Sequence, residues 1–326
     1  MEERLDMICS PGNLKGLRDY VKVFVMGPIQ GAPEWQFNLP VIPGVLWICP
    51  RRPNGKYDYD EQVDWETLGL RISDFALMWI PEPAEDIKGR AYAQTTRIEL
   101  GENLARGKEM VLGCYPDFPG RRYISKKAGD YGKFLYPTLE ETLEELKKLV
   151  KIKTENTRRF FTSDTHFGSQ RTLELSRRPF RDVKDMDWTM IERWNKVVGP
   201  NDTVYHLGDF GDSWPTDYLN GKLNLIMGNY ERKDYDVPDN DRNLGAVHEI
   251  KDEYVLCHEP LKGKEWRRNE SLPVLFGHIH GRQKIKPWKG LDVGVDGHNF
   301  TPVSEEDVKF YINAIEKGYY DEEVFS

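Results

Sequence analysis

Five short apolar segments in the second half of the chain are each followed by a side chain that can bind a metal. The segments begin at Phe160, Thr203, Leu223, Tyr254 and Val274, and short apolar runs bounded by Gly and charged turns are typical of buried strands. In each case an Asp, Asn or His stands where the strand gives way to a loop. The side chains are Asp164, His166, Asp209, Asn229, His258, His278 and His280. We therefore expect a sheet whose strand ends carry polar ligands.

Together these side chains predict a centre for two divalent cations. Carboxylate, amide and imidazole ligands suit first-row metals, and one bridging carboxylate can hold two cations about 3.5–4 Å apart. A lone histidine is usually a core or surface residue, but seven ligand-type residues at five matching strand ends are not explained in that way. Mn, Fe, Ni and Zn all suit such a set, so the sequence predicts two metals without identifying them.

The order and spacing of these residues resemble the calcineurin-like metallophosphoesterases, in particular their small bacterial and phage members. The likeness runs from about Arg158 to Ser304 and implies a β-sandwich flanked by helices. The matching motifs are Asp164-x-His166, Gly208-Asp209, Gly228-Asn229, His258 and Gly277-His-x-His280.

The resemblance also divides the ligands between two metals. Three residues would bind the first metal: Asp164, His166 and His280. Three others would bind the second: Asn229, His258 and His278. Asp209 would bridge the pair, as the shared carboxylate does in proteins of this family.

One position departs from the family pattern. The family has Gly-Asn-His followed by an acidic residue, and here Tyr230 replaces the histidine. That histidine assists the leaving group, and tyrosine is the weaker acid, with an ordinary pKa of about 10 against about 6.5 for histidine. We assign Tyr230 a catalytic position and expect good leaving groups, such as aryl esters, pyrophosphate linkages or strained cyclic diesters. The alternative is that water or His206 supplies the proton.

The first half alternates apolar strands with helices, which predicts a parallel α/β sheet of the flavodoxin or Rossmann type. Strands are expected at residues 21–26, where a Gly27-Pro28 turn follows, and at 44–49, 74–80 and 109–113, and helices are expected at 62–70 and 95–106. The complete chain is expected to form two α/β domains, 1–150 and 158–326, joined by a polar linker at 151–157. Further helices are expected at 138–150, around 186–194, and after Ser304.

A carboxylate near the start of a helix is the candidate nucleophile of the first domain. Glu99 lies in the helix expected at 95–106, and a carboxylate so placed can attack an anomeric carbon to form a covalent glycosyl-enzyme. Asp74, at the start of a strand, is a second carboxylate for the leaving base. The competing interpretation makes Glu99 part of a solvated helix face and Asp74 a capping residue.

The motifs of the first domain resemble the nucleoside 2-deoxyribosyltransferase-like proteins between about Lys22 and Phe118. The matches are Val23-Phe-Val-Met-Gly-Pro28, Trp47-Ile-Cys-Pro50-Arg51, Val63-Asp-Trp65-Glu66, Ser73-Asp74 and Glu99-Leu-Gly101. The resemblance implies Glu99 as nucleophile, Asp74 as a contact to base or ribose, and neighbouring subunits that complete each other's sites. Ala93 stands where the family often has another Asp.

Four residues of this half are candidates for substrate binding: Gly27, Pro28, Arg51 and Trp65. Gly27 and Pro28 follow the first expected strand. Arg51, beside Arg52, can bind a phosphate with two hydrogen bonds, although a solvated pair in a loop is an equally good explanation. Trp65 can stack on a base, or it can belong to the core.

The expected function is a bifunctional, nucleotide-processing enzyme. One domain would hydrolyse a phosphoester, and the other would cleave or transfer at an N-glycosidic bond. Alternatively, the first domain only binds or senses a nucleotide, or the protein is a nuclease. A net charge of −8 without an Arg/Lys-rich stripe argues against nucleic acid, so a small phosphorylated nucleotide is the expected partner.

Cysteine usage and hydropathy indicate the compartment. The four cysteines form no CxxC pair, which is typical of a reducing cytoplasm. No apolar run approaches the roughly 20 residues needed to span a bilayer. We therefore expect a cytoplasmic protein that does not associate with a membrane.

Overall fold

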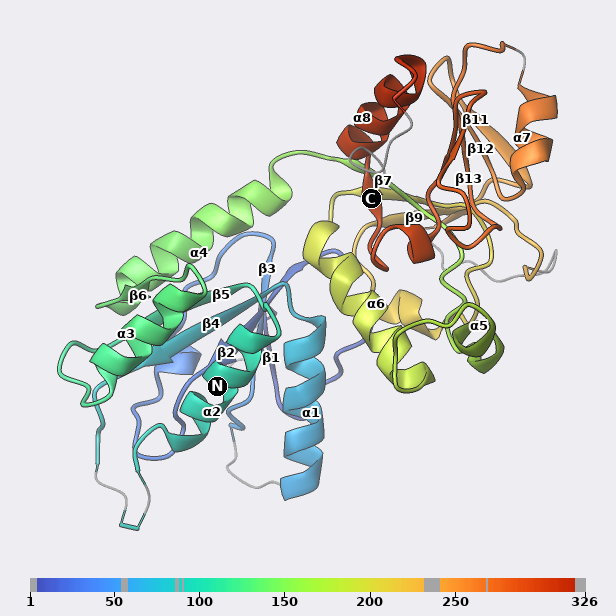
Figure 1. Ribbon diagram of the computed structural model, residues 1–326. Coiled ribbons are helices and arrows are strands. Elements are labelled where there is room, and N and C mark those ends of the chain that lie inside the picture. Colours follow the sequence, from blue (N-terminus) through green and yellow to red (C-terminus); the bar gives the residue numbers. More distant parts are fainter. Residues whose placement is uncertain are drawn as a thin grey trace. The chain divides into compact units, whose positions relative to one another are not determined.

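The computed structural model describes residues 5–53, 58–85, 88–89, 91–231, 241–267 and 269–319. The chain divides into two compact units, Met1–Glu155 and Asn156–Ser326 (Figure 1). Among the described helices, none has both the length and the apolar composition needed to cross a bilayer.

The first unit contains a six-stranded sheet in which all neighbouring strands are parallel, in the order β1-β3-β2-β4-β5-β6. The strands are β1 (Met7–Cys9), β2 (Val21–Met26), β3 (Val45–Cys49), β4 (Phe75–Ile80), β5 (Met110–Cys114) and β6 (Leu135–Tyr136). The predicted parallel α/β sheet is therefore confirmed. The two short edge strands, β1 and β6, were not predicted.

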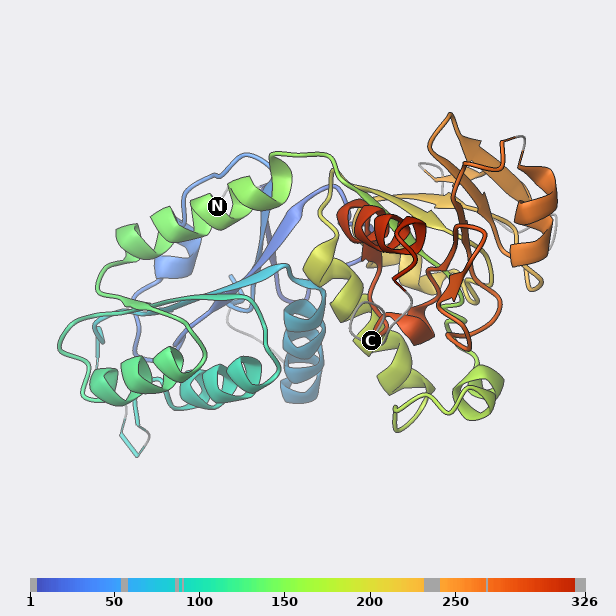
Figure 2. The ribbon, with the colours of Figure 1, turned by 45° about the horizontal axis from the view of Figure 1, so that its top comes forward.

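Helices cover both faces of this sheet. Figure 2 shows α4 (Leu139–Thr154) on one side, and α1 (Tyr59–Ile72), α2 (Gln94–Ala105) and α3 (Arg121–Asp130) on the other. On the first side, Leu146 of α4 packs in one cluster with Val23 and Trp47, beside the short helix η1 (Trp35–Asn38). On the second side, a Cβ on Gly69 of α1 would lie 3.0 Å from Ile48, so the helix approaches the strands closely.

Helix α4 is longer than expected. Thr138 caps its first turn by accepting a hydrogen bond from the Glu141 amide, as the capping-box spacing predicts. The helix then continues through Thr154, so the predicted linker at 151–157 is wrong for its first four residues, Lys151 to Thr154. Lys153 explains the extension, because its ammonium group pairs with Asp74 at 3.1 Å and ties the last turn to the sheet.

The second unit contains two mixed five-stranded sheets, ordered β10-β9-β8-β7-β16 and β11-β12-β13-β15-β14. The first is formed by β7 (Arg159–Thr162), β8 (Thr203–His206), β9 (Lys222–Leu225), β10 (Arg242–Asn243) and β16 (Val303–Ser304). The second is formed by β11 (Val247–Ile250), β12 (Tyr254–Cys257), β13 (Val274–Phe276), β14 (Ile285–Lys286) and β15 (Gly290–Asp292).

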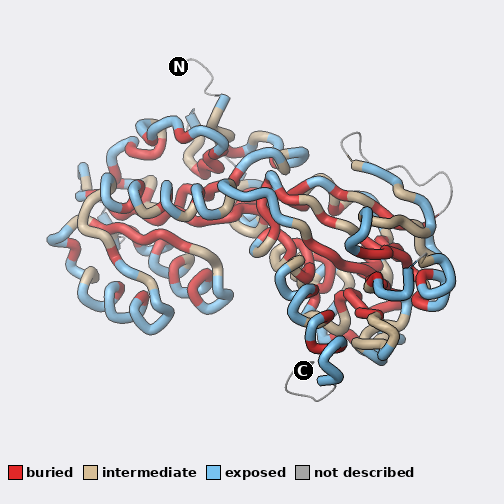
Figure 3. The backbone as a smooth tube through the Cα atoms, turned by 90° about the horizontal axis from the view of Figure 1, so that it is seen from above, coloured by how far each residue is buried: buried red, intermediate tan, exposed pale blue. Residues whose placement is uncertain are grey.

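The two sheets share one hydrophobic core. Phe161 and Ile226 from the first sheet cluster with Leu256 and Leu275 from the second, together with Ile312 of α8 (Glu305–Glu316). Residues that alternate with these along β12 and β13 form a separate cluster on the opposite face of the second sheet, as the two-residue period of a strand requires. Figure 3 shows the buried residues concentrated along the strands.

The remaining helices cover the outer faces. Helices α5 (Gln170–Leu175) and α6 (Val183–Val197) contribute to a third cluster on the first sheet. Helix α7 (Pro260–Trp266) contacts β12 and β13. The single-turn helices η2 (Trp214–Asp217) and η3 (Val295–Gly297) lie in loops. Strands β7, β8, β9, β12 and β13 each end just before the predicted ligand positions, so these side chains project from neighbouring strand ends.

Candidate metal centre

The structure brings the predicted ligands together in two overlapping groups that can each hold a metal ion. Asp164, His166 and His280 form one group, and Asp164, Asp209 and His258 form the other, with ligand atoms within 4.8 Å of one another in each. The remaining two predicted ligands adjoin the second group. Asn229 Nδ2 lies 3.1 Å from His278 Nδ1, which lies 3.2 Å from His258 Nε2.

Asp164 is shared by both groups, and Asp209, a member of the second group, also approaches His166 of the first. The Oδ2 atom of Asp209 is 3.3 Å from Nε2 of His258 and 3.5 Å from Nε2 of His166. Its other oxygen accepts hydrogen bonds from the amides of Asn229 and Tyr230. The carboxylate is therefore fixed by the backbone on one side and directed at both histidines on the other.

Five of the ligands have backbone conformations that residues other than glycine rarely adopt. The φ angles are 59° for Asp164, 49° for His166, 58° for Asp209, 74° for His278 and 49° for His280. Such conformations cost about 1–3 kcal/mol each and persist where the surrounding structure over-determines them, which is typical of functional sites. The strand ends are thus held in a strained arrangement that directs the ligands inward.

Glycines precede three of the ligands because the loops approach one another too closely for a side chain. A Cβ on Gly208 would lie 2.6 Å from the Cα of Gly228 and 2.8 Å from Nδ1 of His258. A Cβ on Gly277 would lie 2.4 Å from Oδ2 of Asp164. Each glycine therefore allows the next ligand to reach the cluster.

The protonation of the central residues follows from their contacts. Burial alone would raise the pKa of Asp209, but the hydrogen bond from His258 and the nearby imidazoles lower it to about 2. Burial disfavours a charged His258, but its hydrogen bond to Asp209 and the charge of Asp164 raise its pKa to about 9. Burial lowers the pKa of His166 to about 4, so this imidazole is neutral at physiological pH.

The residues present fit a metal. Nε2 of His166 is buried and has no hydrogen-bond partner among the described residues, and such an orphaned nitrogen suits a ligand. Nδ1 of His258 donates to the carbonyl of Leu207 at 2.8 Å. Nδ1 of His280 donates to Asp296 at 2.9 Å. In a neutral imidazole, each of these hydrogen bonds places the proton on Nδ1, so that Nε2 is the nitrogen that would bind a metal, as is usual for ligating histidines.

Two supporting residues have no counterpart in the sequence prediction. Glu231 accepts hydrogen bonds from the amides of Asp209, Phe210 and Gly228. The side chain of Arg178 donates to the carbonyls of Asp164 and Thr165 and pairs with Asp296 at 2.9 Å. The role of Arg178 depends on its contact with Asp296, which lies more than 100 residues further along the sequence.

A cavity of about 730 Å³ opens onto the centre. Metal-binding candidates in its wall are His166, Asp209, Asn229, His278 and His280. Tyr230 also lines it, and Nη1 of Arg171 donates to the Tyr230 hydroxyl at 3.2 Å. His206, the alternative proton donor, is fully buried and lies 3.0 Å from the Thr165 hydroxyl. Tyr230 is therefore the better placed of the two to meet a substrate.

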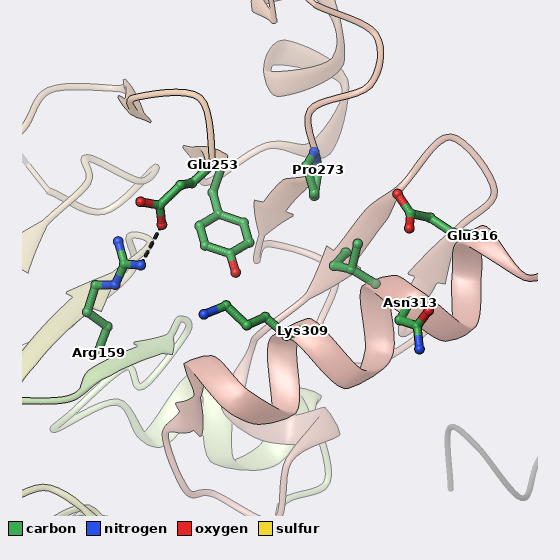
Figure 4. A pocket seen from close by; sticks show the side chains of 8 residues that line it. Arg159, Glu253, Pro273, Lys309, Asn313 and Glu316 are labelled. Atoms are coloured by element: carbon green, nitrogen blue, oxygen red, sulfur yellow. Dashed lines mark hydrogen bonds and ion pairs between the residues drawn. The ribbon is translucent and has the colours of Figure 1, made fainter.

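A second cavity of the same unit, of about 460 Å³, has charges that already pair with one another (Figure 4). Arg159 pairs with Glu253 at 2.5 Å and with Glu305, and Lys309 also pairs with Glu305. These contacts connect β7 to α8. We therefore assign this cavity a structural role.

In the first unit, Glu99 lies close to a carboxylate to which the sequence analysis gave no role. Burial raises the pKa of Glu99 to about 7, and the charge of Glu66 adds to the effect. Burial also raises the pKa of Glu66. Gln62 donates to Glu66 at 2.7 Å and accepts from Arg52 at 2.7 Å. Glu66 was already part of a motif that matched the transferases.

The predicted substrate-binding residues are partly engaged within the protein. The guanidinium of Arg51 donates to the Pro33 carbonyl and to Gln36 at 3.1 Å each. Trp65 donates its indole N–H to the Gly12 carbonyl at 2.8 Å and is 8% exposed. Gly27, followed by Pro28, permits a close approach, because a Cβ there would lie 2.3 Å from the Trp79 carbonyl oxygen.

Asp74 and Gly27 lie at opposite ends of the parallel strands. Asp74 precedes β4 and sits beside Lys22 at the start of β2, whereas Gly27 follows the end of β2. Its carboxylate pairs with Lys153 at 3.1 Å and Lys22 at 3.7 Å. Burial alone would raise the pKa of Asp74, but the two lysines keep it below its usual range. Asp74 therefore links β2 and α4 through its two ion pairs.

Comparisons with known proteins identify relatives but no activity. No family model matches the chain. The gene 66 protein of Mycobacterium phage L5 is 37% identical over 163 residues, which cover 44% of this chain and 78% of the phage protein. The chain belongs to the gene 66 protein family. A second member, from Mycobacterium phage D29, is 26% identical over 206 residues, covering 49% of the chain and 98% of that protein.

Two further matches come from organisms other than mycobacteriophages. An uncharacterized protein of Methanocaldococcus jannaschii is 29% identical over 173 residues, covering 49% of the chain and 92% of that protein. The crystal structure of a protein of unknown function from Aquifex aeolicus matches 47% of the chain and 98% of its own length, with 23% identity and a TM-score of 0.40.

Proposed function

We propose that the second unit is a phosphoesterase that uses two divalent metal ions. The observation that carries this proposal is the convergence of Asp and His ligands from separate strand ends at one cavity. The placement of Asp209 between His166 and His258 supports its role as the bridging ligand. Metal identity is left open among Mn, Fe, Ni and Zn.

The metal ions and the surrounding side chains would have separate roles in hydrolysis. Two ions bound at the centre supply Lewis acidity and lower the pKa of water, so that it becomes a nucleophile at neutral pH. Asp209 fixes the spacing of the ligand sets. Arg178 and Asp296 orient His280 and the Asp164 loop. Tyr230, in the cavity wall, contacts the leaving group.

Metal analysis and an untargeted activity screen test this proposal. The purified full-length protein should contain about two transition-metal ions per chain. With Mn²⁺ it should hydrolyse members of a panel of nucleotides, dinucleotides and cyclic nucleotides, followed by mass spectrometry, and a chelator should abolish the reaction. Full hydrolysis by metal-free protein would refute the proposal.

We propose a second activity for the first unit, because the charge of Glu66 acts on Glu99 and burial raises the pKa of both carboxyl groups. Two neighbouring carboxyl groups can act as nucleophile and acid at a glycosidic bond. The bifunctional protein would then cleave or transfer at the N-glycosidic bond of a nucleoside or nucleotide. In the alternative, this unit binds a nucleotide without cleaving it.

Base release from nucleosides and nucleotides separates these two alternatives. In the full chain, Glu99→Gln should abolish base release and leave phosphoester hydrolysis unchanged. If wild-type protein binds nucleotides but releases no base from any of them, the binding role replaces the catalytic one.

The proposed partner is a small phosphorylated nucleotide. The cavity of about 730 Å³ is within the range of small-molecule sites, and the net charge of −8 disfavours nucleic acid, although a nuclease activity is the remaining alternative. Assembly of the first unit into homo-oligomers, the cytoplasmic location and the absence of membrane association stay predictions.

A further inference from the structure

Four arginines line the cavity that opens onto the metal centre, and one of them, Arg178, pairs with Asp296. Arg171, on α5, and Arg177, just after it, lie on one segment, and Arg282 follows the ligand His280 on another. All three belong to the wall that also contains His166, Asp209 and Asn229. Positive side chains from two separate segments thus face the same space as the ligands.

Within the part of the chain that the structure describes, the charges of Arg177 and Arg282 are not neutralised. The guanidinium groups of Arg177 and Arg282 form no hydrogen bond or ion pair with any residue that the structure describes. By contrast, Arg178 of the same wall pairs with Asp296, and outside the cavity Arg158 pairs with Asp202, Arg159 with Glu253 and Arg181 with Asp185.

The two carboxylates of the cavity wall already interact with histidine or arginine side chains of the protein. They are Asp209, which faces the histidines, and Asp296, which pairs with Arg178 and His280. The wall therefore offers unneutralised cations in a chain whose net charge is −8. Guanidinium groups bind phosphoryl oxygens well because their planar N–H groups match two oxygens at once.

Arg171 forms a hydrogen bond with Tyr230. Its Nη1 donates to the tyrosine hydroxyl at 3.2 Å, so this part of the wall offers a cation beside a weak acid. A leaving alcohol needs a proton as it departs. A leaving phosphate departs as a stable anion and needs positive charge instead. The Arg171–Tyr230 pair suits the second kind of leaving group.

We propose that Arg171, Arg177 and Arg282 bind a second phosphoryl group, and that the substrate is a phosphoanhydride. This inference rests on the proposed phosphoesterase function and narrows its substrate class. Water adds to one phosphorus, and the bond from that phosphorus to the bridging oxygen breaks. The bridging oxygen and its electron pair leave on the second phosphoryl group, held by the arginines, and the proton of the attacking water passes to solvent.

Binding of a non-hydrolysable diphosphate tests the arginine site without relying on turnover. Imidodiphosphate and inorganic phosphate are titrated calorimetrically into the full-length protein with Mn²⁺. The variants are Arg177→Gln, Arg282→Gln and their combination. Arg181→Gln is the matched control, because Arg181 is 82% exposed, pairs with Asp185 and lies outside the described cavity lining.

Each cavity variant should weaken imidodiphosphate binding at least about tenfold, since a charge-assisted hydrogen bond is lost. Phosphate binding should change by less than about threefold, and the control should match wild type in both titrations. Equal losses for the two ligands, or no loss for either, would overturn the assignment, and circular dichroism of each variant checks that it is folded.

Hydrolysis assays then separate this inference from the function on which it rests. If the protein hydrolyses simple phosphomonoesters with metal but prefers them to phosphoanhydrides, the inference fails and the phosphoesterase proposal stands. If no phosphoester or phosphoanhydride is hydrolysed although imidodiphosphate binding depends on Arg177 and Arg282, the phosphoesterase proposal fails and the anion site stands.

Discussion

Oδ2 of Asp209 lies 3.3 Å from Nε2 of His258, while its other oxygen is held by two backbone amides. The side chain therefore cannot turn away from the centre without breaking those hydrogen bonds. A carboxylate held in this way can interact with ions on both sides of it.

Replacing Asp209 by Asn should disturb metal binding more than the loss of a terminal ligand. The Asp209→Asn variant keeps the shape but loses the negative charge, so we expect at least about a hundredfold loss of hydrolysis and fewer metal ions per chain. Asn229→Ala is the comparison. Elemental analysis and initial rates check this, and equal losses in both variants would contradict a bridging role.

The buried carboxyl of Glu99 should make stability depend on pH. Its folded pKa of about 7 lies above the ordinary value of 4.5, so between these values the folded state holds a proton that the unfolded state has lost. The free energy of unfolding should therefore fall as pH rises from about 4.5 to about 7, by up to about 3 kcal/mol, and stay level above.

The Glu99→Gln variant isolates this contribution. Urea unfolding of both proteins at several pH values should show the variant gaining stability relative to wild type as pH rises toward 7. A difference between the two proteins that does not change with pH would show that Glu99 titrates normally.

Restoring histidine at position 230 tests the leaving-group role. Tyr230→His should raise turnover of an alkyl phosphomonoester at least about tenfold, because a better proton donor helps a poor leaving group most. A nitrophenyl ester should change little, since its leaving group needs no proton. Parallel rates on the two esters provide the measurement, and equal changes in both would remove Tyr230 from the mechanism.

The ion pair between Asp74 and Lys153 should contribute to stability. The side chains are 0% and 9% exposed, and removing one partner of a buried pair leaves a costly charge, so Lys153→Met should cost about 3 kcal/mol. Lys151→Met, in the same turn but exposed and paired with exposed Glu155, should cost less than about 1 kcal/mol. Urea unfolding of both variants measures the two losses in the free energy of unfolding. Equal losses would refute the prediction.

Much of the fold was predictable because the signals are local. The apolar runs that begin at Val21, Phe75 and Phe160 are fully or largely buried strands, and their length and flanking turns identify them. The ligand set was predictable for the same reason, since each side chain follows a strand directly. The short edge strands β1 and β6 lack any such pattern and form only by pairing with a neighbour.

The parts that sequence reasoning missed depend on contacts between distant residues. No local pattern shows that Arg178 will meet Asp296, or that Glu231 will bind three amides. Likewise, the helix continues into the expected linker as far as Lys153, whose ammonium group pairs with buried Asp74, about eighty residues earlier. Glu66 was visible in a motif, but only the fold places it beside Glu99.

The helix that ends at Thr154 also determines how the halves can be produced separately. A first-half fragment that stops at Val150 would lack Lys153 and leave Asp74 buried with Lys22 as its remaining lysine. The fragment would then expose the end of an unfinished helix and be prone to aggregation or proteolysis. Separate production of the two units therefore requires a break after Glu155, the last residue of the first unit.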